Sequence, residues 1–208
     1  MRTLLLSLFL FSIALQTSAQ AKKEKVHKIT YLTSSHGKAV PDQDPQVLLL
    51  SAELIKGSSE KKLAGDEVYP YEEFHVNWKA TPAEYIKTAY FSNEESMQTI
   101  DTAFVGGYEY KLTDETKEIL GYTCYKAVTF INSNTIELWY TKDLPYKASP
   151  VAIGQELGMV LEYVRNGNTA ITASKIEQDK QSLSLPKSDL TDALTYQDAI
   201  WKSRFIQI

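Results

Sequence analysis

The chain has 208 residues, of which 43% are hydrophobic and 23% charged, and these fractions are ordinary for one globular domain. They exclude a disordered, a collagenous and a multi-pass membrane protein. The 22 lysines and arginines stand against 26 aspartates and glutamates, so the net charge is -4, without long runs of one sign. We expect no nucleic-acid partner, because no basic field is present to hold a phosphate backbone.

Residues 1–21 have the pattern of a secretory signal peptide. Arg2 precedes an apolar run over residues 4–15, which is shorter than the roughly 20 residues that cross a bilayer. Ala19 and Ala21 form the A-x-A arrangement that signal peptidase accepts, so we expect cleavage after Ala21, with Ala19 as the alternative. The sequence predicts an exported protein, periplasmic, outer-membrane-associated or extracellular, with no transmembrane segment and one domain over residues 22–208.

From Lys28 onward the hydrophobic pattern has a period of two, which is typical of β-strands. Tyrosine is abundant, with 13 residues, whereas glycine is scarce, with 9, and both counts favour strands. Asn166-Gly167 predicts a hairpin between its flanking strands, and Gly106-Gly107 predicts a second one. Residues 47–56 also fit a helix. The expected strands cover residues 27–32, 47–56, 74–78, 85–91, 97–104, 108–112, 119–131, 136–141, 157–165 and 168–176.

The spacing changes after Leu185-Pro186. Apolar residues recur at helical intervals from Leu190 to Trp201, which predicts one amphipathic helix. Sequential strands joined by short turns are antiparallel, and a long flat sheet leaves reactive edges, so the sheet is expected to curl or close. The predicted fold is therefore mainly β, a single antiparallel curved sheet or incomplete barrel with one C-terminal amphipathic helix.

Within the strand at 74–78, the alternation separates two faces. Phe74, Val76 and Trp78 are predicted to point inward, while Glu73, His75 and Asn77 are predicted to face water. Adjacent acids such as Glu72-Glu73 then point to opposite faces, so they do not converge on one substrate atom as glycosidase carboxylates must. We interpret them as surface charge.

No catalytic or metal-binding pattern stands out in the sequence. The three histidines fall at no spacing that brings two onto one helical face, and the single Cys124 supplies no thiolate pair for zinc. No glycine-rich nucleotide-binding pattern is present. The sequence therefore predicts no enzyme, no cofactor and no metal site.

Cys124 stands on an apolar face of the period-2 pattern, which predicts a buried side chain. A nucleophile or a link to a partner is the alternative. Burial in apolar surroundings raises the pKa of a thiol, so we expect Cys124 to be inert. The face assigned to it holds Leu120, Tyr122, Cys124, Val128 and Phe130.

Short motifs between residues 117 and 162 occur in an order that a known protein family also shows. They are Gly121-Tyr122-Thr123-Cys124-Tyr125-Lys126-Ala127, Leu138-Trp139-Tyr140-Thr141, Leu144-Pro145, Ser149-Pro150 and Leu157-Gly158-Met159-Val160-Leu161-Glu162. This order resembles the GLPGLI family of small exported proteins of Bacteroidetes-type bacteria. The naming motif is degraded, because Leu157 stands where the family has proline and Ser149 where it has glycine. The second resemblance is to lipoprotein-carrier-like incomplete β-barrels.

The resemblance implies structural rather than catalytic roles for the matching positions. They are Gly121, Tyr122, Cys124, Ala127, Trp139, Tyr140, Pro145, Pro150, Gly158, Leu161 and Glu162. It also implies an envelope protein without established biochemical activity. The predicted function is a non-enzymatic cell-envelope protein that binds a lipid, lipoprotein, peptide or other apolar ligand in a groove between sheet and helix. The alternative is an accessory or assembly module that binds another envelope protein through a sheet edge or an aromatic face.

Overall fold

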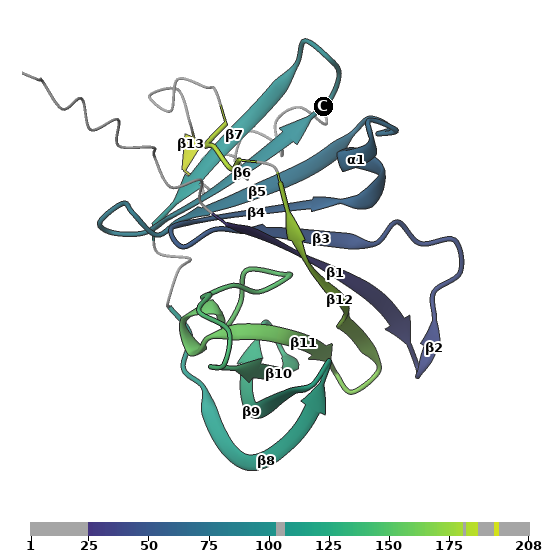
Figure 1. The fold of residues 1–208 in the computed structure, drawn as a ribbon, viewed down its shortest axis with the longest axis vertical. Helices are drawn as coiled ribbons and strands as arrows, with labels where there is room; N and C mark the ends of the chain where they lie inside the picture. Colours follow the sequence, from purple (N-terminus) through teal and green to yellow (C-terminus); the bar gives the residue numbers. More distant parts are fainter. Residues whose placement is uncertain (1–24, 103–106, 181, 187–193, 196–208) are drawn as a thin grey trace, which may run out of the picture.

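A computed structural model describes residues 25–102, 107–180, 182–186 and 194–195. The described residues form one open, largely antiparallel sheet (Figure 1). Its strands run in the order β13-β7-β6-β5-β4-β3-β1-β12-β11-β10-β9-β8, and β2 pairs with β1 beside this path. The prediction of a mainly β, single antiparallel sheet is confirmed. The sheet is not closed, because β8 and β13 end the path unpaired with each other.

The described residues form thirteen strands and two short helices. The strands are β1 (Val26–Ser35), β2 (Lys38–Ala39), β3 (Gln46–Leu50), β4 (Leu54–Ser59), β5 (Tyr71–Asn77), β6 (Glu84–Tyr90), β7 (Ser96–Asp101), β8 (Lys111–Ile119), β9 (Tyr122–Ile131), β10 (Asn134–Thr141), β11 (Met159–Arg165), β12 (Thr169–Asp179) and β13 (Leu194–Thr195). Two short helices, α1 (Glu60–Ala64) and η1 (Gln155–Leu157), accompany them. The single strand expected over 47–56 is wrong, because a turn at Ser51 divides it into β3 and β4.

The two predicted glycine hairpins have different outcomes. Asn166-Gly167 joins β11 to β12 with both residues at positive φ, 52° and 67°, so this prediction is confirmed. The hairpin expected at Gly106-Gly107 is wrong, because β7 pairs with β6 whereas β8 pairs with β9, at the other end of the sheet. The chain crosses there from one meander, β3 to β7, to a second, β8 to β12, and β1 joins the two by pairing with β3 and β12.

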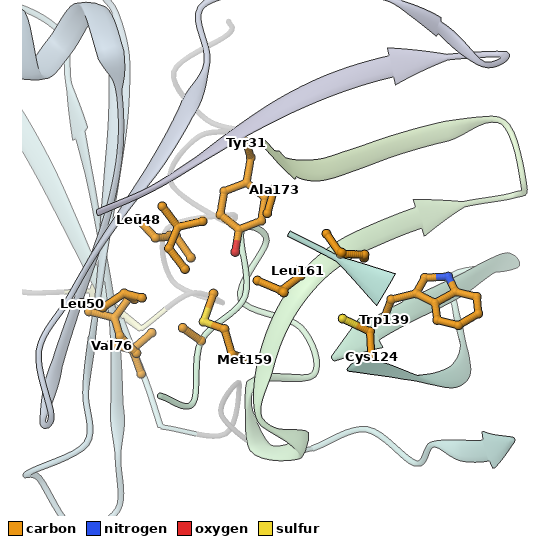
Figure 2. Close-up of a cluster of buried hydrophobic side chains, with 13 residues drawn as sticks. Tyr31, Leu48, Leu50, Val76, Cys124, Trp139, Met159, Leu161 and Ala173 are labelled. Atoms are coloured by element: carbon orange, nitrogen blue, oxygen red, sulfur yellow. The ribbon is translucent and has the colours of Figure 1, made fainter. Parts of the chain in front are cut away.

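Each of the two meanders contributes one face to a shared hydrophobic core. Figure 2 shows Tyr31, Leu48, Leu50 and Val76 opposite Met159, Leu161 and Cys124, all buried in the same cluster. Tyr31 also donates a hydrogen bond of 2.8 Å from its hydroxyl to the carbonyl of Val160, which satisfies its one polar group inside the core. The strongly bent sheet in Figure 1 follows from this packing, because one sheet must fold over to cover its own apolar face.

The expected C-terminal amphipathic helix is not seen in the described part of the chain. Leu194–Thr195, inside the predicted helix, form β13, which pairs in parallel with Thr99 and Ile100 of β7. The rest of that segment lies outside the described residues, as does the predicted signal peptide. Within the described ranges, no helix is long and apolar enough to span a membrane.

Candidate functional site

A cavity of about 460 Å³ opens on the inner face of β3–β6, the face that also carries Leu48, Ile55 and Val76 of the core. Its volume falls in the range of small-molecule pockets, roughly 300 to 1,000 Å³. The lining residues are Gln46, Val47, Leu48, Gly57, Ser58, Ser59, Glu72, Glu73, Phe74, Tyr85, Lys87, Pro150 and Val151. The floor is therefore four strands of one meander, and the wall comes from the loop between β10 and β11.

Strand register explains why these side chains meet. Leu48 is paired with Gly57, Gly57 with Phe74, and Phe74 with Lys87, so one row of neighbours crosses four strands. Directly paired residues point to the same face of a sheet, so every member of the row faces the cavity. A neighbouring row begins with the pair Gln46 and Ser59.

Gly57 leaves room for the aromatic part of the floor. A Cβ atom at Gly57 would lie 2.0 Å from Cε1 of Phe74, so the ring of Phe74 occupies the space that any other residue would need. The rings of Phe74 and Tyr85 lie 5.5 Å apart with an interplanar angle of 32°. The strand expected over residues 47–56 ends just before Gly57, whereas Gly57 lies inside β4. A glycine inside a strand also signals a close approach, and that signal was the available pointer to this site.

The polar part of the floor is an ion pair. Lys87 Nζ lies 2.7 Å from Glu72 Oε2, and both side chains remain partly accessible to solvent. Gln46 adds an amide whose Oε1 is buried without a hydrogen-bond partner in the described structure. The cavity therefore combines two aromatic rings with a carboxylate, an ammonium group and an amide.

The wall of the cavity is a tightly held loop. Ala148 bridges to Met159, and the amide of Val160 donates to the carbonyl of Ala148 at 2.8 Å. Gly158 adopts φ 144°, and a Cβ there would lie 2.6 Å from the carbonyl oxygen of Thr141. Such backbone is open to glycine alone, so Gly158 fixes the path of this loop.

The structure places the eleven positions singled out in the sequence in different surroundings. Cys124, Ala127, Trp139, Tyr140 and Leu161 are buried, whereas Pro145 is exposed. Gly121 lies in the β8–β9 turn at φ 82°, Tyr122 is half-buried, and Glu162 forms an ion pair with Lys117. Of the eleven positions, Pro150 is the one that lines the cavity. The sequence did not single out five other residues that line the cavity, which are Gln46, Gly57, Ser59, Tyr85 and Lys87.

The inner face predicted for Cys124 is only partly right. Cys124 is fully buried and packs in the shared core, but Leu120 lies in an exposed turn and Phe130 is 75% exposed. A turn at Leu120-Gly121 interrupts the long strand that the pattern suggested, and Lys126 interacts with Glu115 and Glu137 instead of facing the core. Burial raises the pKa of the Cys124 thiol to about 11.

The outer face of β5 is also different from the prediction. Glu73 and His75 are buried, at 5% and 4% exposure, although the alternation placed them in water. The alternation within one strand carries no information about what packs outside it: Glu73 contacts Ser58 and Lys56 of β4, and on the same face of β3 Leu63 of α1 packs against Val47 and Leu49. Glu72 and Glu73 do point to opposite faces, as expected, one into the cavity and one to the outer face.

Buried charge on the outer face is compensated locally. Glu73 Oε1 accepts a hydrogen bond from Ser58 Oγ at 2.7 Å and lies 3.0 Å from Lys56 Nζ. Burial, and then the charge of Lys56, lowers the pKa of His75 to about 4, so the imidazole is neutral near pH 7. Among the described residues, no three His, Cys, Asp or Glu side chains gather where they could hold a metal ion.

Comparison with known proteins gives a consistent assignment. A family profile described as "N-glycanase peptide, N-terminal domain" matches residues 29–198. Two solved structures of PNGF-II, in different crystal forms, are similar to the chain, with 37% identity and a TM-score of 0.74, and with 34% and 0.72. Each likeness covers 86% of this chain, which spans only 34% and 33% of the two PNGF-II chains. No match is found among curated proteins.

These findings overturn several expectations. The resemblances to GLPGLI proteins and to lipoprotein carriers are wrong, because the matching profile runs through most of the chain, whereas the GLPGLI likeness rested on short motifs between residues 117 and 162. Both predicted functions, the non-enzymatic envelope protein with an apolar groove and the assembly module, are wrong for the same reason, and so is the expectation that no enzyme is involved. The chain belongs to the family of N-glycanase N-terminal domains.

Proposed function

We propose that the chain is the substrate-binding module of an N-glycanase, an enzyme that removes glycans from asparagine side chains of polypeptides. The observation that carries the proposal is the cavity on the inner face of β3–β6. Family membership supplies the substrate class, a glycopeptide, and the cavity supplies the place where part of it binds. Because the chain spans about one third of the PNGF-II chains, the activity of the whole enzyme is part of the proposal.

The lining of the cavity supports a polar, ring-containing ligand. Binding pockets typically join apolar walls to a few polar groups that fix orientation. Here Leu48, Phe74 and Val151 supply apolar surface, while Glu72 and Lys87 supply charged hydrogen-bonding groups on one side. A glycopeptide offers both hydroxyl-rich sugar and extended backbone, so it can use this mixture.

Binding of a defined glycopeptide to the full chain tests the proposal. The ligand is a short peptide with one N-glycosylated asparagine, and the same peptide without glycan serves as the reference, both measured by calorimetry. Val151→Trp fills the cavity from its wall and is expected to weaken glycopeptide binding at least about tenfold, since contact with much of the pocket is lost. Val68→Trp, at a position 80% exposed and outside the cavity, is the matched control and is expected to bind normally. No binding by the unaltered chain, or equal binding by Val151→Trp, would overturn the proposal.

Export is part of the same proposal, because a glycopeptide-binding enzyme module must reach glycosylated polypeptides. Its support is the signal-like segment over residues 1–21, ending in Ala19 and Ala21. N-terminal sequencing of protein recovered from the culture medium or periplasm is expected to begin at Lys22. An unprocessed Met1 on protein inside the cell would contradict export.

A further inference from the structure

We infer that the cavity recognises the sugar part of the glycopeptide, by stacking an uncharged pyranose ring on Phe74 and Tyr85 while Glu72 and Lys87 bind its hydroxyls. The inference rests on the proposed function and assigns the ligand class and the residues that select it.

The aromatic pair has the right form for a sugar face. One face of a pyranose presents C–H groups, which pack on the negative face of an aromatic ring, while its hydroxyls project around the edge. The ring centroids of Phe74 and Tyr85 lie 5.5 Å apart and the ring planes differ by 32°, so the rings are a tilted, offset pair that overlaps in part. This pair is the platform on which we place the sugar ring. Gly57 supports the platform, because the missing Cβ lets the ring of Phe74 lie against the strand.

The polar groups stand where ring hydroxyls need them. In register, Lys87 is the direct partner of Phe74, and its ammonium group lies 2.7 Å from the carboxylate of Glu72. A hydroxyl can donate to Glu72 and accept from Lys87 at once, and hydrogen bonds to charged groups are the stronger kind. Gln46 adds a buried carbonyl oxygen without a partner in the described structure, which a ligand hydroxyl could satisfy.

The charge of the cavity favours a neutral sugar over an acidic one. Glu72 and Lys87 neutralise each other, and the neighbouring Glu73 points to the outer face, where Lys56 lies 3.0 Å away. An anionic sugar would have to compete with Glu72 for Lys87 and would approach a carboxylate at the same time. The cavity therefore selects the uncharged portion of a glycan.

The experiment compares a free sugar with the glycopeptide and its glycan-free peptide. N,N′-diacetylchitobiose is the uncharged probe and N-acetylneuraminic acid the acidic one, each titrated into the full chain and followed by calorimetry and by NMR. Tyr85→Leu removes half of the platform and is expected to weaken chitobiose binding about tenfold, the scale of one aromatic contact. Tyr125→Leu on β9 is the matched control, because Tyr125 is a partly exposed tyrosine outside the cavity.

A second variant keeps the test independent of packing. Glu72→Gln leaves the size of the side chain unchanged and removes its charge, so the fold is retained while the hydroxyl contact weakens. We expect a threefold to tenfold loss, about the difference between a hydrogen bond to a charged carboxylate and one to a neutral amide. The inference is supported if chitobiose binds, neuraminic acid binds more weakly, and both cavity variants lose affinity whereas Tyr125→Leu does not.

The outcomes separate this inference from the proposed function. If the glycopeptide binds and Val151→Trp weakens it, but chitobiose does not bind and Tyr85→Leu has no effect, the inference is wrong and the proposed function stands. If neither glycopeptide nor chitobiose binds, both are overturned. If neuraminic acid binds as well as chitobiose, the selection of neutral sugars is wrong.

Discussion

The two meanders of the sheet use the alternation of side chains differently. The strands β8–β11 place apolar residues on both faces: Cys124, Trp139 and Leu161 lie in one cluster, and Leu138 and Val160 in another. The strands β3–β6 have the shared core at one end of their inner face and a polar, aromatic cavity at the other. The meander β8 to β12, the filled meander, is packed for stability, whereas the meander β3 to β7, the cavity meander, leaves space where ligand groups can enter. A polar residue on the inner face of a strand is thus the feature that separates a binding surface from a core.

The largest expected effect on stability is at the loop between β10 and β11, which forms the wall of the cavity. Gly158→Ala forces φ 144° on a residue with a Cβ and places that atom 2.6 Å from the carbonyl oxygen of Thr141, so we expect a loss of about 3 kcal/mol or more in the free energy of unfolding. Gly121→Ala is the control, because Gly121 has φ 82° but nothing within 4 Å of the added Cβ, and it should cost about 1 kcal/mol. Urea unfolding measures both. Equal losses would show that the contact with Thr141 is unimportant.

The next effect concerns the outer face of the cavity meander. The pKa of His75 is about 4 when folded against 6.5 as the ordinary value, so below pH 6.5 the unfolded chain binds a proton that the folded chain does not. The free energy of unfolding therefore falls as the pH falls, and the contribution of His75 to this loss is about 2 to 3 kcal/mol between pH 7 and pH 4.5. His75→Gln should remove this part of the slope in urea unfolding at several pH values, whereas His36→Gln, in an exposed turn, should keep it. An unchanged slope in His75→Gln would contradict the assignment.

A third prediction addresses the inner face of the same meander. Gly57→Ala places a Cβ 2.0 Å from the ring of Phe74, and overpacking of this kind costs about 2 kcal/mol. The cost should fall when Phe74→Leu is introduced as well, because the smaller side chain leaves room. A double-mutant cycle in urea unfolding measures this coupling. Additive losses would mean that Gly57 is needed for another reason, and the platform argument would weaken.

The smallest effect returns to the filled meander. Cys124 is fully buried, with a thiol pKa raised to about 11 by burial, so a thiol-specific reagent near pH 7.5 should react only after denaturation. Cys124→Ser should cost roughly 1 to 2 kcal/mol, because a hydroxyl enters the core. Rapid labelling of the folded protein would show that this meander opens far more easily than its packing indicates.

Several features of the fold followed from local sequence signals. The period-2 pattern identified most strands, and Asn166-Gly167 fixed the β11–β12 hairpin because few other residue pairs accept two positive φ values in succession. The burial of Cys124 followed from its place in the pattern. The faces predicted for strand 74–78 were correct for its inner residues, Phe74 and Val76. The prediction that His75 faces water was wrong, because the pattern of one strand carries no information about what packs outside it.

Apart from Gly57, whose place inside a strand signals a close approach, the contacts of the candidate site have no local signal in the sequence. The cavity is built from β3, β4, β5 and β6, which are neighbours in register, together with Pro150 and Val151 from a loop more than sixty residues further along the chain. The short motifs between residues 117 and 162 suggested the wrong family, since turn and strand motifs recur in unrelated β-proteins for the same steric reasons.

By itself, the sequence determined the class of the fold, mainly β with an antiparallel sheet, and the position of one hairpin, because strand periodicity and turn conformations are properties of adjacent residues. Only the tertiary structure decided that β7 and β8 separate instead of pairing, that Glu73 and His75 are buried, and that Phe74, Tyr85, Glu72 and Lys87 line one cavity. These features depend on which strands become neighbours, and that choice is made by burial of apolar surface over the whole chain rather than by any single segment.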